Sequence, residues 1–326
     1  MAWRQLYPSR WRGVKPPVVP LRARPGRAWR AAPGYICRMQ ITPTGAALGA
    51  EVTGVDLRQL DAATTEALHR AWLAHEVLLV RDQHLTDDDL IAFSRRFGTL
   101  DHAPIQENGR RFVDGHPEIY VVSNVVENGV AIGSLGAGEA VWHTDMSYLE
   151  NPPKASVLYS IEVPPSGGDT SFCTMSGAWA ALPDALKGRL AGLRVKHDGT
   201  YNSGGFVRQG VTPTDDPRTA PGTMHPLVAE HPESGRTVLY LGRRRNAWIE
   251  GLSLEESNRL LDDIWAHATA PALCWRHTWR VGDVVFWDNR SVMHRRDAFD
   301  ATSRRVMHRT QIAGGAPLRP VAQPRA

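Results

Sequence analysis

The stretch "VWHTDMSY", residues 141–148, places an imidazole and a carboxylate two positions apart. On an extended segment alternate side chains point the same way, so His143 and Asp145 would face one common space. A bare pair of this kind is more often a structural histidine beside a turn aspartate than part of a metal site. The stretch therefore raises the question of where a further ligand would come from.

A second stretch, "GDVVFWDNRSVMHRRDAFDATSRRVMHRT" (282–310), offers His294 just after an apolar strand, followed by Arg305 and Arg309. Two histidines and one carboxylate on one face form the facial triad that suits non-heme Fe(II), with open positions for oxygen chemistry. Zinc accepts the same ligand types, but a structural zinc site normally has four protein ligands. A guanidinium beyond the last histidine can hold a dicarboxylate in a bidentate pair, which favours iron.

The overall composition limits the class of protein. The chain has 326 residues, 42% of them hydrophobic, which suits one large domain or two small ones. No apolar run reaches the roughly 18 residues of a transmembrane helix. The cysteines Cys37, Cys173 and Cys274 are scattered and none has CxxC spacing. They argue against a disulfide framework, and we predict a reducing, cytoplasmic location.

The basic character of the chain comes from its first 38 residues. Residues 1–38 hold nine of the 38 Lys and Arg residues and no acidic residue, which leaves 29 basic against 34 acidic residues in the remainder. Nucleic-acid binding therefore loses its main support. With six prolines and no apolar period, residues 1–38 are predicted to be a disordered extension. A transit peptide and translation from upstream of a true start at Met39 are the alternatives.

Residues 39–326 are predicted to form one domain of mainly β structure with helical insertions. Helical spacing or capping residues indicate helices at 61–76, 86–98, 176–190 and 253–267. Strand-like stretches occur at 118–125, 154–163, 170–175, 237–242, 272–281, 283–289 and 304–312. No strand–GxGxxG–helix unit occurs, which disfavours a dinucleotide-binding fold. Many short strands with insertions favour a sheet sandwich or jelly roll with helices outside.

Residues 39–316 resemble the taurine/2,4-dichlorophenoxyacetate dioxygenase (TauD/TfdA) family of Fe(II)- and 2-oxoglutarate-dependent oxygenases. The stretches that carry the resemblance are "GAEVTGVDL", "FSRRFG", "WHTDMSYLENPP", "VPPSGGDTSF", "HPLVAEHPESGR" and "WDNRSVMHRRDAFD…RRVMHRT". The resemblance implies a double-stranded β-helix (jelly-roll) core. It also implies that Fe(2+), 2-oxoglutarate and O2 oxidise a substrate C–H bond, with release of succinate and CO2.

The resemblance assigns roles to individual residues. His143, Asp145 and His294 match the iron ligands. Thr170 and Arg305 match the residues that bind the distal carboxylate of 2-oxoglutarate.

Other positions of the resemblance concern the primary substrate. Arg309 and the backbone N–H of Met146 match anion donors, and Tyr148 would line the cavity. His102 stands one place out of line with the family's substrate-contacting histidine, and Glu139 replaces an asparagine. We therefore expect a small anionic substrate, a carboxylate rather than a sulfonate. Arg305 and Arg309 should share one strand face, with His308 turned away.

Three other functions remain as alternatives. A halogenase or a desaturase could use the same scaffold, although the presence of Asp145 disfavours a halogenase. A non-catalytic jelly-roll binding or regulatory protein is the third alternative. We expect no nucleic-acid or membrane partner, and a homodimer or homotetramer would be ordinary for the family.

Overall fold

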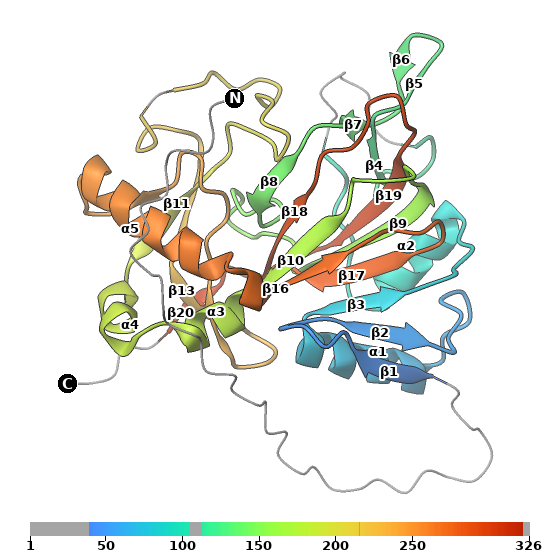
Figure 1. Ribbon diagram of the computed structural model, residues 1–326, viewed down its shortest axis with the longest axis horizontal. Coiled ribbons are helices and arrows are strands. Elements are labelled where there is room, and N and C mark those ends of the chain that lie inside the picture. Colours follow the sequence, from blue (N-terminus) through green and yellow to red (C-terminus); the bar gives the residue numbers. More distant parts are fainter. Residues whose placement is uncertain (1–38, 105–112, 215, 322–326) are drawn as a thin grey trace, which may run out of the picture. The chain divides into compact units, whose positions relative to one another are not determined.

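Two packed β-sheets form the centre of the protein (Figure 1), seen in a computed structural model that describes residues 39–104, 113–214 and 216–321. The described residues belong to the compact unit Arg38–Ala326. The extension expected at residues 1–38 lies outside the described residues, so its disorder stays a prediction.

The larger sheet has eight strands. In spatial order they are β1 (Gln40–Pro43), β2 (Ala50–Thr53), β3 (Val77–Val80), β17 (Val284–Asp288), β9 (Ala155–Glu162), β19 (Val306–Ile312), β4 (Tyr120–Ser123) and β7 (Ser134–Leu135). Neighbours are antiparallel except for the parallel pairs β2–β3 and β4–β7. Strands from both ends of the chain therefore meet in one sheet.

The smaller sheet has four strands, in the order β16 (Cys274–His277), β10 (Thr170–Thr174), β18 (Val292–Arg296) and β8 (Ala140–His143). Its pairs are antiparallel, and His294 of β18 lies directly opposite His143 of β8. A sandwich of mostly antiparallel strands confirms the predicted jelly-roll core with helical insertions.

The alternation of β17 shows how the large sheet separates two apolar layers. Val284 and Phe286 join one hydrophobic cluster, whereas Val285 and Trp287 join another. The first layer lies under the helices α1 (Ala62–His75) and α2 (Asp87–Arg95), where Trp72 of α1 stacks on Phe286 at 4.6 Å. The second layer also contains Phe172 of the small sheet, so it fills the space between the two sheets.

A third apolar cluster lies beside the sandwich and contains residues of α3 (Met175–Ala181), α4 (Asp184–Leu190) and α5 (Leu254–Ala268). Its sheets are β12 (Gly222–Pro226), β11 (Arg194–Asp198) and β15 (Trp248–Ile249), and β14 (Thr237–Leu239), β13 (Val228–Glu230) and β20 (Arg319–Pro320). The remaining elements are the hairpin β5 (Val126–Glu127) and β6 (Val130–Ala131) and the 3-10 turn η1 (Pro271–Leu273).

The helix starts agree with the sequence because the capping side chains act locally. Asp61 accepts from the N–H of Thr64, and the Thr86 side chain caps α2. Ser253 and Glu256 form a reciprocal capping box at the start of α5. The helix expected at 176–190 is two short helices, because Pro183 separates α3 from α4.

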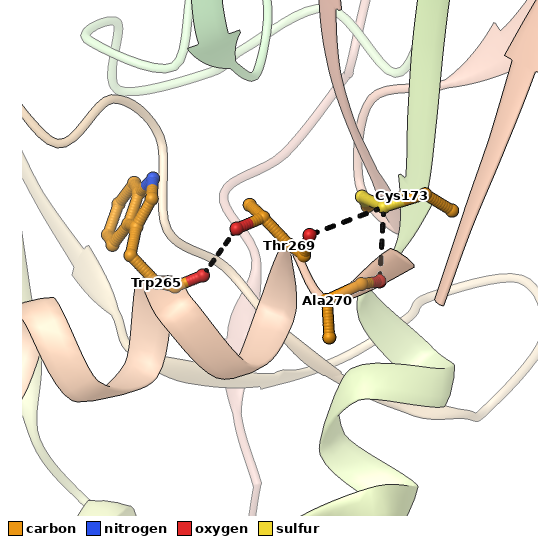
Figure 2. Close-up of a disulfide and its surroundings, with 5 residues drawn as sticks. Cys173, Trp265, Thr269 and Ala270 are labelled. Atoms are coloured by element: carbon orange, nitrogen blue, oxygen red, sulfur yellow. Dashed lines mark hydrogen bonds between the residues drawn. A yellow bond between two sulfur atoms is a disulfide. The ribbon is translucent and has the colours of Figure 1, made fainter. Parts of the chain in front are cut away.

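The expectation of no disulfide was wrong. Cys173 and Cys274 are bonded, with an S–S distance of 2.06 Å. They are 101 residues apart in sequence but stand opposite each other on the antiparallel strands β10 and β16. Figure 2 shows Cys173 near Thr269 and Ala270 at the C-terminal end of α5. The inference from the cysteines to a reducing compartment therefore loses its basis.

Among the described residues, every helix is too short or too polar to cross a lipid bilayer.

A network of buried charges holds the loop after β13 against the end of β17. His231 donates from Nε2 to Asp288 at 2.9 Å, and Arg290 bonds the same carboxylate. Arg290 also reaches Glu233 at 2.6 Å. Burial alone would raise the pKa of Glu233, but the charge and hydrogen bond of Arg290, with Lys154 and His69, lower that pKa to about 2. Ionised Glu233 should therefore stabilise the fold.

We expect Glu233→Gln to lower the free energy of unfolding by about 1–2 kcal/mol at pH 7. Because the folded pKa of about 2 lies below the unfolded value of 4.5, the difference should be complete above pH 5 and shrink as the pH falls from 4.5 toward 2. Urea unfolding of both proteins at several pH values measures it. A difference that grows on acidification would contradict this origin.

Candidate metal and co-substrate site

The three predicted metal ligands come together in the structure. His143, Asp145 and His294 are all buried, and their potential ligand atoms lie within 4.8 Å of one another. The Oδ1 atom of Asp145 is 3.6 Å from Nε2 of His143 and 3.9 Å from Nε2 of His294. Antiparallel pairing of β8 with β18 brings the two imidazoles together, with ring centroids 4.2 Å apart and ring planes inclined at 48°.

Strand alternation was expected to bring His143 and Asp145 to one side, and this expectation was wrong. Asp145 reaches its position because the chain turns after His143. β8 ends at His143, and Met146 has a left-handed backbone with φ of 46°. The turn is held from outside: the N–H of Thr144 donates to the carbonyl of Gly242 at 3.0 Å. Nε2 of His225 bonds the carbonyls of Ser147 and Leu149 at 2.8 and 3.0 Å.

The surroundings of His143 and His294 favour metal binding. Nδ1 of His143 donates to the carbonyl of Val141 at 2.7 Å, which leaves the Nε2 lone pair directed to the site. Burial lowers the pKa of His143, and burial together with the charge of His143 lowers the pKa of His294 well below the usual range. Neutral imidazole is the form that binds a metal.

A directional chain of hydrogen bonds fixes the second oxygen of Asp145. Trp287 donates from Nε1 to Oδ1 of Asn289 at 2.9 Å, and Nδ2 of Asn289 donates to Ser156 Oγ at 3.0 Å. The Ser156 hydroxyl then donates to Oδ2 of Asp145 at 2.7 Å. All of these side chains are buried. The chain leaves Oδ1 as the oxygen that faces the two histidines.

Arg309 is the ionic partner of Asp145. Its Nη1 donates to Oδ1 at 2.9 Å, and its guanidinium carbon lies 4.9 Å from the centre of the Tyr120 ring. Burial alone would raise the pKa of Asp145, but Arg309 and the histidines hold it well below the usual range. The carboxylate is therefore ionised at neutral pH, as a metal ligand must be.

The histidines open onto a cavity of about 460 Å³, its open mouth included. Its polar and charged lining includes His143, His294, Thr170, Arg296, Arg305 and Arg309. The predicted co-substrate residues thus share one cavity with the imidazoles. Thr170 accepts from Nε1 of Trp279 at 2.9 Å. Arg305 is 1% exposed, and its Nε and Nη1 have no hydrogen-bond partner.

The strand face predicted for the two arginines is confirmed. Arg305 stands just before β19 and Arg309 lies within it, and both line the cavity. Val306 packs in the layer under the helices, and His308 turns away to Asp87 at 2.6 Å.

The remaining predicted site residues lie outside the cavity lining. His102 is exposed, and Met146 and Tyr148 are partly buried. The guanidinium carbon of Arg208 lies 4.2 Å from the centre of the Tyr148 ring. Their substrate roles stay predictions.

The roles of Ser156, Asn289 and Arg296 were not predicted from the sequence. Arg296 had a sequence signal, since it stands two positions after His294 and shares its strand face. Ser156 had none, because its partner Asp145 lies in a turn.

Comparison with known proteins agrees with this geometry. The family described as "Taurine catabolism dioxygenase TauD, TfdA family" matches residues 40–311. The chain belongs to the TauD/TfdA family. It is therefore an Fe(II)- and 2-oxoglutarate-dependent dioxygenase, and the buried His-Asp-His donor set fits iron.

Two curated TauD/TfdA relatives and one solved structure illustrate the match. The (S)-phenoxypropionate/alpha-ketoglutarate-dioxygenase of Delftia acidovorans is 35% identical, over 85% of this chain and 95% of that protein. The alpha-ketoglutarate-dependent 2,4-dichlorophenoxyacetate dioxygenase of Burkholderia sp. (strain RASC) is 37% identical, over 73% and 82%. A putative alpha-ketoglutarate-dependent taurine dioxygenase from Burkholderia xenovorans superposes with a TM-score of 0.70 at 35% identity, over 86% of this chain and 91% of that one.

We expect Ser156→Ala to weaken metal binding by about 10- to 100-fold, because it removes the group that orients Asp145. Titration of the protein with Mn(II), followed by electron paramagnetic resonance, measures the affinity. Ser160→Ala is the matched control, since Ser160 is a buried, hydrogen-bonded serine of the same strand that contacts Arg280 and Asp283 instead. Equal Mn(II) affinities for the two variants would show that Ser156 does not position the ligand.

Proposed function

We propose that this dioxygenase oxidises a C–H bond of a small organic acid, with Arg309 as the residue that recruits the acid group. The observation that carries the proposal is the single cavity in which the imidazoles, Thr170, Arg305 and Arg309 meet. Hydroxylation can be followed by cleavage where the oxidised carbon bears a heteroatom.

The proposed division of labour gives the metal three ligands and leaves the remaining positions open. His143, Asp145 and His294 would hold Fe(II). When bound, Fe(II) supplies oxygen activation coupled to decarboxylation of 2-oxoglutarate to succinate and CO2. The protein contributes binding, orientation and the exclusion of water from the cavity.

Arg305 and Thr170 are suited to the distal carboxylate of 2-oxoglutarate. The Arg305 guanidinium is buried with free Nε and Nη1 donors, a costly arrangement unless an anion occupies the site. A carboxylate accepts two parallel bonds from such a group. Trp279 orients the Thr170 hydroxyl by donating to its oxygen, so the hydroxyl proton is left to donate to a ligand.

Arg309 is placed to bind a second anion. One of its donors bonds Asp145, and its buried Nε has no partner. Guanidinium has five N–H donors, so the contact with Asp145 leaves several for a substrate. A group bound there would lie beside the metal ligands, where the substrate carbon must be presented.

A carboxylate is the acid group that we favour. The substrates named for the relatives from Delftia acidovorans and Burkholderia sp. are phenoxyalkanoic acids, which carry a carboxylate on a short chain. The altered positions His102 and Glu139 argue against a taurine-like sulfonate. The competing functions have less support: Asp145 occupies the position that a halide would need, and the complete ligand set disfavours a non-catalytic role.

A cytoplasmic location and assembly into a homodimer or homotetramer belong to the same proposal. The disulfide-bonded cysteines no longer support that location.

A substrate screen tests the proposal. Short carboxylates, aryloxyalkanoates, sulfonates and sulfate esters are incubated with enzyme, Fe(II), 2-oxoglutarate and oxygen, and substrate-dependent succinate is measured. We expect turnover of one or more carboxylates. Turnover of sulfonates or sulfate esters with no response to carboxylates would overturn the preferred acid group.

For the carboxylate found, Arg309→Gln should raise KM by about 10- to 100-fold through loss of a charged hydrogen bond. Titration with Mn(II) first establishes that the metal site of the Arg309→Gln variant is intact. This variant should still decarboxylate 2-oxoglutarate in the absence of substrate. Arg304→Gln is the matched control, because Arg304 is exposed and pairs with Glu162 and Glu127. The carboxamide analogue of the substrate tests the role of the charge. If Arg309→Gln raises the KM of the carboxamide as much as that of the acid, Arg309 does not recognise the charge.

A further inference from the structure

Arg296 is a second buried guanidinium at the same cavity. It is 6% exposed, lines the cavity with Arg305, and has an Nε without a hydrogen-bond partner. Its position on β18, two residues after the ligand His294, points its side chain to the same side of the strand as the imidazole. Arg296 has no role in the co-substrate and substrate sites proposed above.

Arg296 and Arg305 line the same cavity and both lie near the ring of Phe299. Their guanidinium carbons are 5.3 and 5.9 Å from the centre of the Phe299 ring. In the described part of the chain neither arginine has an ion-pair partner, whereas the neighbouring Arg295 pairs with Glu139 and Asp297. Two buried cations without a counter-anion are unfavourable, so the pair requires an anionic ligand.

The electrostatics support this view. Burial, and then the positive charge of Arg296, lower the pKa of Arg305 well below its usual value. The two guanidiniums therefore repel each other, and a carboxylate placed between them would relieve both.

Arg296 also holds the wall of the cavity. Its Nη2 donates to the carbonyl of Leu135 at 3.1 Å and to the carbonyl of Gly138. Leu135 lines the cavity and has a left-handed backbone with φ of 77°, which a leucine rarely adopts. The bonds from Arg296 explain how the glycine-rich segment 133–140 is kept in this conformation.

We propose that Arg296 is a second cationic residue of the 2-oxoglutarate site, which acts with Arg305 on the distal carboxylate and fixes the segment 133–140 that walls the cavity. The inference rests on the proposed 2-oxoglutarate site and extends it. The ligand class that fits this site is a dicarboxylate. Its 2-oxo acid end would be bound at the metal ligands, and its second carboxylate would be bound by Arg296 and Arg305. Monocarboxylic 2-oxo acids would leave both cations without a partner.

The experiment compares two co-substrates that differ in the distal carboxylate alone. Isothermal titration calorimetry measures the binding of 2-oxoglutarate and of 2-oxopentanoate, which has the same chain length, to Mn(II)-loaded protein without oxygen. We expect Arg296→Gln to raise the Kd of 2-oxoglutarate by about 10- to 100-fold and to change the Kd of 2-oxopentanoate little. Arg296→Lys keeps the charge and should retain part of the affinity for 2-oxoglutarate.

Two further variants make the outcomes distinguishable. Arg295→Gln, the adjacent arginine of the same strand with its own carboxylate partners, should bind both ligands as the unaltered protein does. Arg305→Gln should lose affinity for 2-oxoglutarate. If the unaltered protein fails to bind 2-oxoglutarate, the proposed function itself fails. If Arg305→Gln weakens 2-oxoglutarate but Arg296→Gln does not, the role of Arg296 alone is refuted.

If Arg296→Gln weakens the binding of 2-oxoglutarate and 2-oxopentanoate to the same extent, Arg296 does not recognise the distal carboxylate. Its role would then be limited to holding the segment 133–140. Should Arg296→Gln be unstable, Arg296→Lys decides by itself. Its selectivity for 2-oxoglutarate over 2-oxopentanoate should then fall below that of the unaltered protein, and an unchanged selectivity would refute the proposal.

Discussion

The placement of one buried carboxylate, Asp145, is the constraint on which the site depends. A carboxylate removed from water must be paired and hydrogen-bonded. Arg309 from the large sheet neutralises one oxygen, and Ser156 from the neighbouring strand β9 binds the other. The two imidazoles come from the small sheet. The carboxylate thus joins both sheets of the sandwich, and its two oxygens are given different tasks by their different partners.

This arrangement explains how the cavity can hold many positive charges. Arg309 has Asp145 as its counter-ion, but Arg296 and Arg305 lack one among the described residues. A cavity of this kind favours dianionic over monoanionic co-substrates before any shape selection acts. The relatives' phenoxyalkanoic acids would add a further anion near Arg309. Separate binding of the two anions, by Arg309 and by the pair Arg296 and Arg305, would keep substrate and co-substrate in distinct places.

The sequence predicted what local chemistry determines. Helix starts at Asp61, Thr86 and Ser253 follow from capping side chains within the same turn, and the faces of Arg305 and His308 follow from strand alternation. Contacts between distant segments were missed. Cys173 and Cys274 are paired by strand register across 101 residues, and Ser156 meets Asp145 only because a turn bends the chain after His143. Neither composition nor periodicity contains that information.

The packing between the two sheets sets the distance between the arginines of the proposed binding sites and the metal ligands. His143 and His294 belong to the small sheet, whereas Arg309 lies in β19 of the large sheet and Arg305 stands just before that strand. The layer that separates them contains Phe172 and Trp287, whose rings lie 6.1 and 4.8 Å from the His294 ring. Protein interiors are close-packed, so a change of side-chain volume here would shift one sheet against the other. These aromatic residues therefore serve the fold and the reaction at once: they set how far apart the two halves of the site stand.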